Sequence, residues 1–228
     1  MQDRLYAAGA RLLLLPLQAR VLRAPLTWFA KVWLRHARIV AHLRRAQYDA
    51  VVDGGAGVGE FAALVRVALP EARLVCVEPH PASAATLRRR GFEVVEAALW
   101  NAEGDVLLTQ PEPAATSCTA VGSPISGRPT WRVRAVRLDQ LGIDGRRVFV
   151  KLDLQGAEPR ALEGMDSLWD RCAGLLLEVS YGEAGTYEAL RAALVARGFA
   201  EAGTLNELET DGGIVEADKL FLRRGSLG

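Results

Sequence analysis

The sequence contains few of the residues that most often bind metals or form disulfide bonds. Its 228 residues include three cysteines and three histidines. Cys76, Cys118 and Cys172 are widely spaced, which argues against a disulfide framework and indicates a reducing compartment. The apolar run at residues 12–17 is too short to span a membrane, and no small-residue cleavage pattern follows it. We therefore expect a cytoplasmic protein without a transmembrane segment, and we predict no metal site.

Acidic and basic side chains nearly balance over the whole chain, with a net charge of +1, but not along it. Residues 1–50 carry nine Lys or Arg against two Asp or Glu, a net charge of +7, which leaves −6 for residues 51–228. The acidic remainder is not expected to bind nucleic acid, because phosphate binding depends on clustered basic residues. The length fits one α/β domain over residues 47–228, preceded by a basic helical extension over residues 1–46.

The extension has an apolar stripe and a basic stripe at helical spacing. The apolar positions are Leu22, Leu26, Phe29, Trp33, Val40 and Leu43, and the basic positions are Lys31, Arg35, Arg38, His42 and Arg45. The simplest interpretation is a helix that covers the core and keeps a solvated face, with His36 as a half-buried packing residue. The alternative is a dock for a membrane surface or an acidic carrier protein. An oligomer is also compatible with the sequence.

The most informative stretch is a glycine-rich turn that follows a short β-branched strand. Residues 51–60 read VVDGGAGVGE, and helical spacing resumes at Phe61. Glycine permits a positive φ and lets a ligand approach the backbone, and the helix behind the turn offers unpaired N–H groups. A dinucleotide site requires G-x-G-x-x-G, which no register of these glycines provides. The spacing that fits is D-x-G-x-G-x-G, which resembles motif I of the class I methyltransferases that use S-adenosylmethionine (SAM). The cofactor-binding residues predicted here are Asp53, Gly55, Ala56, Gly57, Gly59 and Glu60.

From Ala50 onward, short apolar strands alternate with helices, which predicts a doubly wound, Rossmann-like, mostly parallel sheet. Strands are expected at 50–53, 73–78, 92–99, 106–109, 131–138, 148–153 and 175–179, and helices at 59–68, 82–90 and 183–197. Residues from Phe199 onward and residues 219–222 should close a sheet of seven strands, with Lys219 as a surface cation.

Three features near the strand ends extend the predicted site. Glu78 lies 25 residues beyond Asp53, where nucleotide-binding sheets place a carboxylate that accepts both ribose hydroxyls, and Pro79 follows it. Trp100 could stack on adenine and Asn101 could hydrogen-bond it.

Residues 110–130 are rich in proline, glycine, serine and threonine, which predicts a lid or a mobile binding loop. Ser117 is its most plausible polar contact. Beyond the following strand, Asp139 could cap a short helix.

A second chemical stretch spans residues 148–158, VFVKLDLQGAE. An apolar strand rarely contains Lys151 and Asp153 unless they face a cavity or each other. Lysine is also scarce, with three lysines in the chain against 25 arginines. Glu158 falls in the first turn of the next helix, where a negative charge is favoured. These three residues form the predicted catalytic group, although a buried structural ion pair is the simpler alternative.

Four blocks in this order resemble the FkbM family of SAM-dependent methyltransferases. They are residues 53–59, 77–79 (VEP), 136–141 (VRLDQL) and 150–158 (VKLDLQGAE), and the resemblance covers about residues 48–180. It implies O-methylation of a hydroxyl on a natural product or sugar, with SAM as cofactor. The chain departs from the family at Gly57, where Asn is frequent, and at Gln155, where Glu is frequent. The second departure puts any inherited acidic role of position 155 in doubt.

The last predicted strand ends near Glu178 and Tyr181, which we expect to line the acceptor pocket together with Ser117. In this hypothesis, Asp153 or Glu158 accepts the hydroxyl proton and Lys151 orients the carboxylate or steadies the developing oxyanion. Two alternatives remain. One is an NAD-dependent oxidoreductase, which the glycine spacing disfavours. The other is a methyltransferase fold that has lost catalysis and serves as a binding subunit.

Overall fold

The computed structural model describes residues 37–109, 118–181, 186–211 and 213–225. Most of the N-terminal extension therefore lies outside the described residues, as do His36 and Ser117, so the predictions for them stay predictions. Residues 37–46 form a helix, of which Val40 and Leu43 are buried in the core as the apolar stripe indicates. None of the helices in these four ranges combines the length and apolar character that crossing a bilayer requires.

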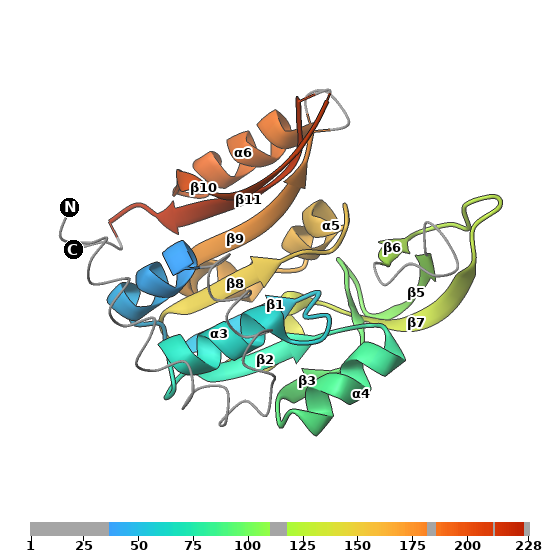
Figure 1. Ribbon diagram of the computed structural model, residues 1–228, viewed down its shortest axis with the longest axis horizontal. Helices are drawn as coiled ribbons and strands as arrows, with labels where there is room; N and C mark the ends of the chain where they lie inside the picture. The colour runs from blue at the N-terminus through green and yellow to red at the C-terminus, as the bar shows by residue number, and fades with distance from the viewer. Residues whose placement is uncertain (1–36, 110–117, 182–185, 212, 226–228) are drawn as a thin grey trace.

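A seven-stranded sheet forms the centre of the molecule (Figure 1). Its strand order is β10-β11-β9-β8-β1-β2-β3. The strands are β1 (Ala50–Gly54), β2 (Arg73–Val77), β3 (Glu93–Val95), β8 (Val148–Leu152), β9 (Cys172–Ser180), β10 (Phe199–Thr210) and β11 (Gly213–Arg223). The pairs from β3 to β9 are parallel, whereas β11 is antiparallel to both its neighbours. The predicted doubly wound, mostly parallel sheet of seven strands is confirmed.

Helices cover both faces of this sheet, because the side chains of its central strands alternate between two cores. Val51 of β1 packs with the helix over 37–46 and with α3 (Glu60–Ala68), while Val52 packs on the opposite face. The other helices are α4 (Pro81–Arg89), α5 (Glu158–Glu163), α6 (Thr186–Ala196) and the 3₁₀ turns η1 (Leu138–Gln140) and η2 (Asp166–Arg171). Parallel β1 and β8 thus end side by side, with Asp53 opposite Lys151.

A second sheet, which the sequence reasoning did not predict, lies beside the ends of β1 and β2 (Figure 1). Its order is β4-β7-β5-β6, with β4 (Ala98–Leu99), β5 (Gly104–Thr109), β6 (Thr119–Val121) and β7 (Thr130–Val136). The strand expected over 92–99 is therefore two strands in different sheets. Part of the expected loop at 110–130 is the strand β6, which pairs with β5.

Three polar side chains differ from the sequence-based expectation. Lys219 is buried rather than on the surface, because its ammonium group donates to Thr204 Oγ1 at 2.7 Å and pairs with Glu201 at 3.4 Å. His42 is buried against Tyr48 rather than solvated, with Nε2 at 2.7 Å from the Tyr48 hydroxyl. Asp139 makes no cap to η1, and its carboxylate instead pairs with Arg137.

Candidate functional site

The glycine turn after β1 is tied to its neighbours through the backbone. Gly55 N donates to Val77 O at 3.0 Å, and Gly55 has a φ of +69°. A Cβ on Gly55 would stand 1.9 Å from the backbone oxygen of Asp153, so no larger residue fits there. Gly57 also has a positive φ, +54°, but a Cβ added to it would have no heavy atom within 4 Å. Gly57 therefore borders open space, whereas Gly55 is needed for close packing.

The end of the turn opens α3. Gly59 occupies the N-cap position with a φ of +91°, and a Cβ there would meet Leu87 at 2.8 Å. The third predicted glycine thus has a packing reason of its own. Glu60 begins the helix and, with Ala56, lines a cavity in front of the turn.

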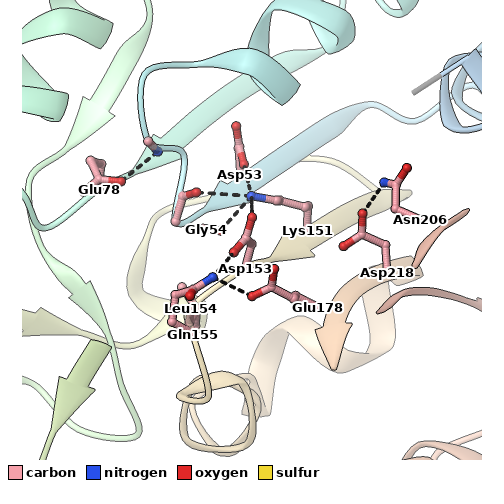
Figure 2. Close-up of polar contacts among 12 residues, drawn as sticks. Asp53, Gly54, Glu78, Lys151, Asp153, Leu154, Gln155, Glu178, Asn206 and Asp218 are labelled. Atoms are coloured by element: carbon pink, nitrogen blue, oxygen red, sulfur yellow. Dashed lines mark hydrogen bonds and ion pairs between the residues drawn. The ribbon is translucent and has the colours of Figure 1, made fainter. Parts of the chain in front are cut away.

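Glu78 holds the turn in place from the end of β2. Its carboxylate accepts the N–H of Gly57 at 2.7 Å, shown in Figure 2, and the N–H of His80 at 2.8 Å. The side chain is largely buried, and this burial raises the pKa of Glu78. The two N–H donors lower the pKa but do not outweigh burial. A carboxylate offers about four acceptor positions, so two remain for a ligand.

A cavity of about 250 Å³ lies between the glycine turn and the second sheet. Gly55, Gly57, Glu78 and Pro79 line one side, together with Asp153. The opposite wall is apolar and is formed by Ala97, Ala98, Leu99, Leu108, Ala120 and Leu154. This cavity, called the first cavity below, is thus lined by polar groups at the strand ends and by apolar side chains.

Trp100 and Asn101 are not among the residues that line the first cavity. Trp100 packs against the core of the second sheet, and the Asn101 amide donates to Glu163 at 2.7 Å. The apolar segment 97–99 takes the position at the cavity that was expected for these two residues. The sequence carried no signal for this, because the break between β3 and β4 redirects the chain.

Lys151 stands at the centre of the polar contacts behind the turn (Figure 2). Its Nζ lies 3.4 Å from Asp53 and 3.2 Å from Asp153, and it donates to Gly55 O at 3.1 Å. Burial alone would lower the pKa of Lys151, but the two carboxylates outweigh burial and raise it. The charged Lys151 side chain on β8 thus connects this strand to Asp53 on β1 and to the glycine turn.

Asp53 is 0% exposed and lies beneath the turn. Burial raises the pKa of Asp53, and Lys151 opposes this effect. Neither of its oxygens accepts a hydrogen bond from the described residues, so the ion pair with Lys151 is its principal compensation. Asp53 does not line the first cavity, so the structure places this predicted cofactor-binding residue beneath the turn rather than at the cavity.

Glu158 is bound to the backbone at the start of α5. Its carboxylate accepts the N–H of Leu154 at 2.6 Å and the N–H of Gly156 at 3.0 Å, and its side chain is buried. Burial raises the pKa of Glu158 to about 7, against the backbone donors. These contacts fix the turn that carries Asp153, which makes Glu158 the less available of the two predicted bases.

Asp153 lies where two cavities meet. It lines the first cavity and also the cavity in front of the glycine turn, which we call the second cavity. Lys151, Glu178 and Asp218 line this second cavity as well. Burial opposes ionisation of Asp153, but Lys151 and the neighbouring Glu178 and Gln155 side chains lower its pKa. An ionised carboxylate at the junction of two cavities can accept a proton from a molecule bound in one of them.

The side of the site near β9 and β11 contains residues that the sequence reasoning missed. Asp218 lines the second cavity and accepts a hydrogen bond from the Asn206 amide (Figure 2). A third cavity beyond Gln155 is lined by Glu158, Glu178 and Arg128. Glu178 lines both of these cavities, whereas Tyr181 packs edge-on against Tyr187 and lines neither. No motif marks Asn206 and Asp218, because strand pairing alone brings β10 and β11 together.

A doubly wound sheet with a glycine turn, a buried carboxylate after the next strand and cavities at the strand ends is the arrangement in which α/β proteins commonly bind nucleotide-type ligands. The family model described as the methyltransferase FkbM domain matches residues 53–201. The chain belongs to this family of methyltransferases.

Comparison with curated proteins finds no match. Among solved structures, precorrin-6y C5,15-methyltransferase from Geobacter metallireducens GS-15 is similar, with 17% identity and a TM-score of 0.48 over 82% of this chain and 86% of that chain. Magnesium protoporphyrin IX methyltransferase from Synechocystis PCC 6803, solved with bound SAM, has 14% identity and a TM-score of 0.48 over 86% and 83%.

Proposed function

We propose that this protein is a SAM-dependent O-methyltransferase that acts on a hydroxyl group of a small molecule, either a natural product or a sugar. The observation that carries the proposal is the position of Asp153. Its carboxylate borders both the cavity beside the glycine turn and the cavity beside Glu178, and Lys151 stands 3.2 Å behind it. A base at that junction lies between a cofactor on one side and an acceptor on the other.

The residues around the first cavity fit SAM. Glu78 retains acceptor positions for two ribose hydroxyls, and the open space at Gly57 leaves room for the ligand at the turn. The apolar wall at residues 97–99 suits the adenine ring. When bound, SAM supplies an electrophilic methyl group on a positively charged sulfur.

The chain's own residues would supply positioning and a proton acceptor. Asp153 takes the proton of the acceptor hydroxyl, and Lys151 keeps Asp153 ionised and oriented. Most of the acceleration in such a transfer is expected from holding the two reactants in line, which is worth several kcal/mol. Glu158 then acts on the turn at 154–156 rather than on the acceptor.

The first test is titration calorimetry with S-adenosylhomocysteine, run beside NADH, on the full chain and on Glu78→Ala. We expect micromolar binding of S-adenosylhomocysteine alone, weakened at least tenfold, or ~1.4 kcal/mol, in Glu78→Ala. Glu96→Ala, which removes an exposed glutamate paired with Arg88, is the matched control and should bind like the wild type. Binding of NADH instead, or of neither compound, would refute the methyltransferase proposal.

Intact binding of S-adenosylhomocysteine with no turnover on any hydroxyl acceptor, together with tight binding to an acidic protein, would favour the non-catalytic binding subunit. The basic residues at 1–46 remain our proposed contact for a membrane surface or an acidic carrier protein.

A further inference from the structure

Gln155 joins the two carboxylates that border the acceptor side of the site (Figure 2). Its amide nitrogen lies 3.1 Å from Asp153 Oδ1 and 2.7 Å from Glu178 Oε2. An amide NH₂ group has two hydrogens, so it can donate to both carboxylates at once. A glutamate in this position could not do so in its ionised form.

The backbone holds Gln155 in a costly conformation. Its φ is +56°, and among the described residues other than glycine this sign is shared only with Gln47, at +53°. Such a conformation is unfavourable for a side chain that lacks a local hydrogen-bonding role. The Thr119 hydroxyl on β6 donates to Gln155 O at 2.9 Å and helps to fix it. This backbone conformation and the Thr119 hydrogen bond orient the Gln155 amide toward the carboxyl groups of Asp153 and Glu178.

Asp153 and Glu178 accept hydrogen bonds from the same amide nitrogen, so their carboxyl groups lie close to each other. Two carboxyl groups held this close rarely ionise together, because the second charge is repelled by the first. Lys151 lies beside Asp153, whereas no cation of the described residues forms an ion pair with Glu178. The charge therefore belongs on Asp153 and the proton on Glu178.

We infer that Gln155 is a positioning residue that bridges Asp153 and Glu178, with Glu178 protonated and Asp153 as the ionised member facing the acceptor hydroxyl. This inference rests on the proposed function. In the transfer, the acceptor O–H bond breaks and its proton goes to Asp153, while the O–CH₃ bond forms and the S–CH₃ bond breaks. The proton already on Glu178 stays there, and Gln155 contributes hydrogen bonds only.

The charged groups around the pair are consistent with this division. Lys151 on β8, with Asp53 behind it on β1, faces Asp153. Glu158 on α5, Glu216 on β11 and Arg128 line the third cavity with Glu178, and Asp218 on β11 lines the second cavity with it. Burial and these neighbouring carboxyl groups, Asp153 first among them, raise the pKa of Glu178 to about 9, whereas that of Asp153 is lowered.

The experiment is a ¹³C NMR titration of the side-chain carboxyl groups in the full chain, which needs no acceptor. Gln155→Gly removes the amide and relieves the backbone, so the chain should remain folded. The loss of a hydrogen bond to a charged group should raise the lower apparent pKa of the pair by about one unit. Gln155→Asn, which tolerates the same backbone but is one methylene shorter, should give a rise in the same direction.

Gln47→Gly is the matched control, because Gln47 has the same left-handed backbone and its amide donates to Arg44 O, away from the pair. It should leave the titration of the pair unchanged. Gln155→Glu replaces the amide with a third carboxyl group and should raise the lower apparent pKa further than Gln155→Gly does.

An unchanged titration in Gln155→Gly would overturn the inference, as would an equal rise in Gln47→Gly. These outcomes are independent of S-adenosylhomocysteine binding, which tests the proposed function separately. Once an acceptor is identified, the acidic limb of the kcat profile should move to higher pH in Gln155→Gly by the same amount as the NMR value. A limb that stays in place would also overturn the inference.

Discussion

Lys151 compensates the buried charge of Asp53 and also pairs with Asp153. Asp53 is fully buried and has its ion pair with this lysine, so Lys151→Met would leave a buried carboxylate without compensation. We expect the free energy of unfolding at pH 7 to fall by about 3 kcal/mol, measured by urea denaturation. Lys151→Met should also weaken binding of S-adenosylhomocysteine, because Lys151 donates a hydrogen bond to Gly55 O in the glycine turn.

The loss in Lys151→Met should depend on pH in a defined direction. Burial raises the pKa of Asp53, so the Asp53 carboxyl group binds a proton more tightly in the folded protein than in the unfolded chain. A raised carboxyl pKa favours the folded state at low pH, and this advantage is lost as pH rises. The destabilisation should therefore be smaller at pH 5 than at pH 8, and smaller at both in the double variant Asp53→Asn with Lys151→Met. An equal loss at both pH values would contradict this account.

Asp153 and Glu158 are distinguished by what their oxygens contact. Asp153 borders two cavities, whereas both oxygens of Glu158 accept backbone N–H groups. We expect Asp153→Asn to lower kcat by about 10²-fold to 10⁴-fold with little change in S-adenosylhomocysteine affinity. Methyl transfer by Asp153→Asn and by Glu158→Gln, measured with labelled SAM, is the comparison, and Glu158→Gln should keep more activity. Full turnover by Asp153→Asn would show that the base lies elsewhere.

At the scale of the element, two glycines of the turn have different expected roles: Gly55 is required for packing, and Gly57 borders the space for a ligand. Gly55→Ala would place a Cβ 1.9 Å from a backbone oxygen, and we expect it to lower the free energy of unfolding by at least ~2 kcal/mol. Gly57→Ala has open space and should cost only the ~1–2 kcal/mol of a left-handed residue. Its Cβ projects toward the cavity, so its larger effect should be on S-adenosylhomocysteine affinity in calorimetry. The reverse order of the two stabilities would be inconsistent with this turn.

The start of α5 should respond to pH through Glu158. Burial raises its pKa to about 7, above the value of roughly 4.3 for an exposed glutamate. Its stabilising contribution is therefore present below about pH 4 and is lost as the pH rises to about 7. Glu158→Gln should flatten the fall in unfolding free energy between pH 5 and 7, measured by denaturation. Glu188→Gln, on the exposed face of α6, is the control and should keep the wild-type slope.

At the scale of the whole molecule, the site joins β1, β2, β8, β9 and the second sheet, so a ligand there should stabilise the fold as a unit. S-adenosylhomocysteine at a hundred times its Kd should raise the free energy of unfolding by ~2.7 kcal/mol. For a chain of this size, the midpoint of thermal unfolding should rise by about 5 °C or more. NADH at the same concentration should leave the midpoint unchanged, and a rise with NADH would count against the proposal.

The amino-acid sequence by itself determined the doubly wound sheet, the glycine turn and the strand-end carboxylates. These features are local: alternating apolar residues specify strands and helices, and glycine spacing specifies the turn. Parallel strands bring their carboxyl ends to one edge, so Asp53, Glu78 and Asp153 could be assigned to one edge of the sheet without coordinates.

Only the tertiary structure decided how these residues divide their roles. The second sheet replaced Trp100 and Asn101 with an apolar wall, and the pairing of β10 with β11 brought Asn206 and Asp218 to the site. Long-range strand pairing and burial decide such contacts, and neither leaves a short motif in the sequence. The role inferred for Gln155 likewise depends on Asp153 and Glu178, because only the folded chain places both carboxyl groups beside its amide.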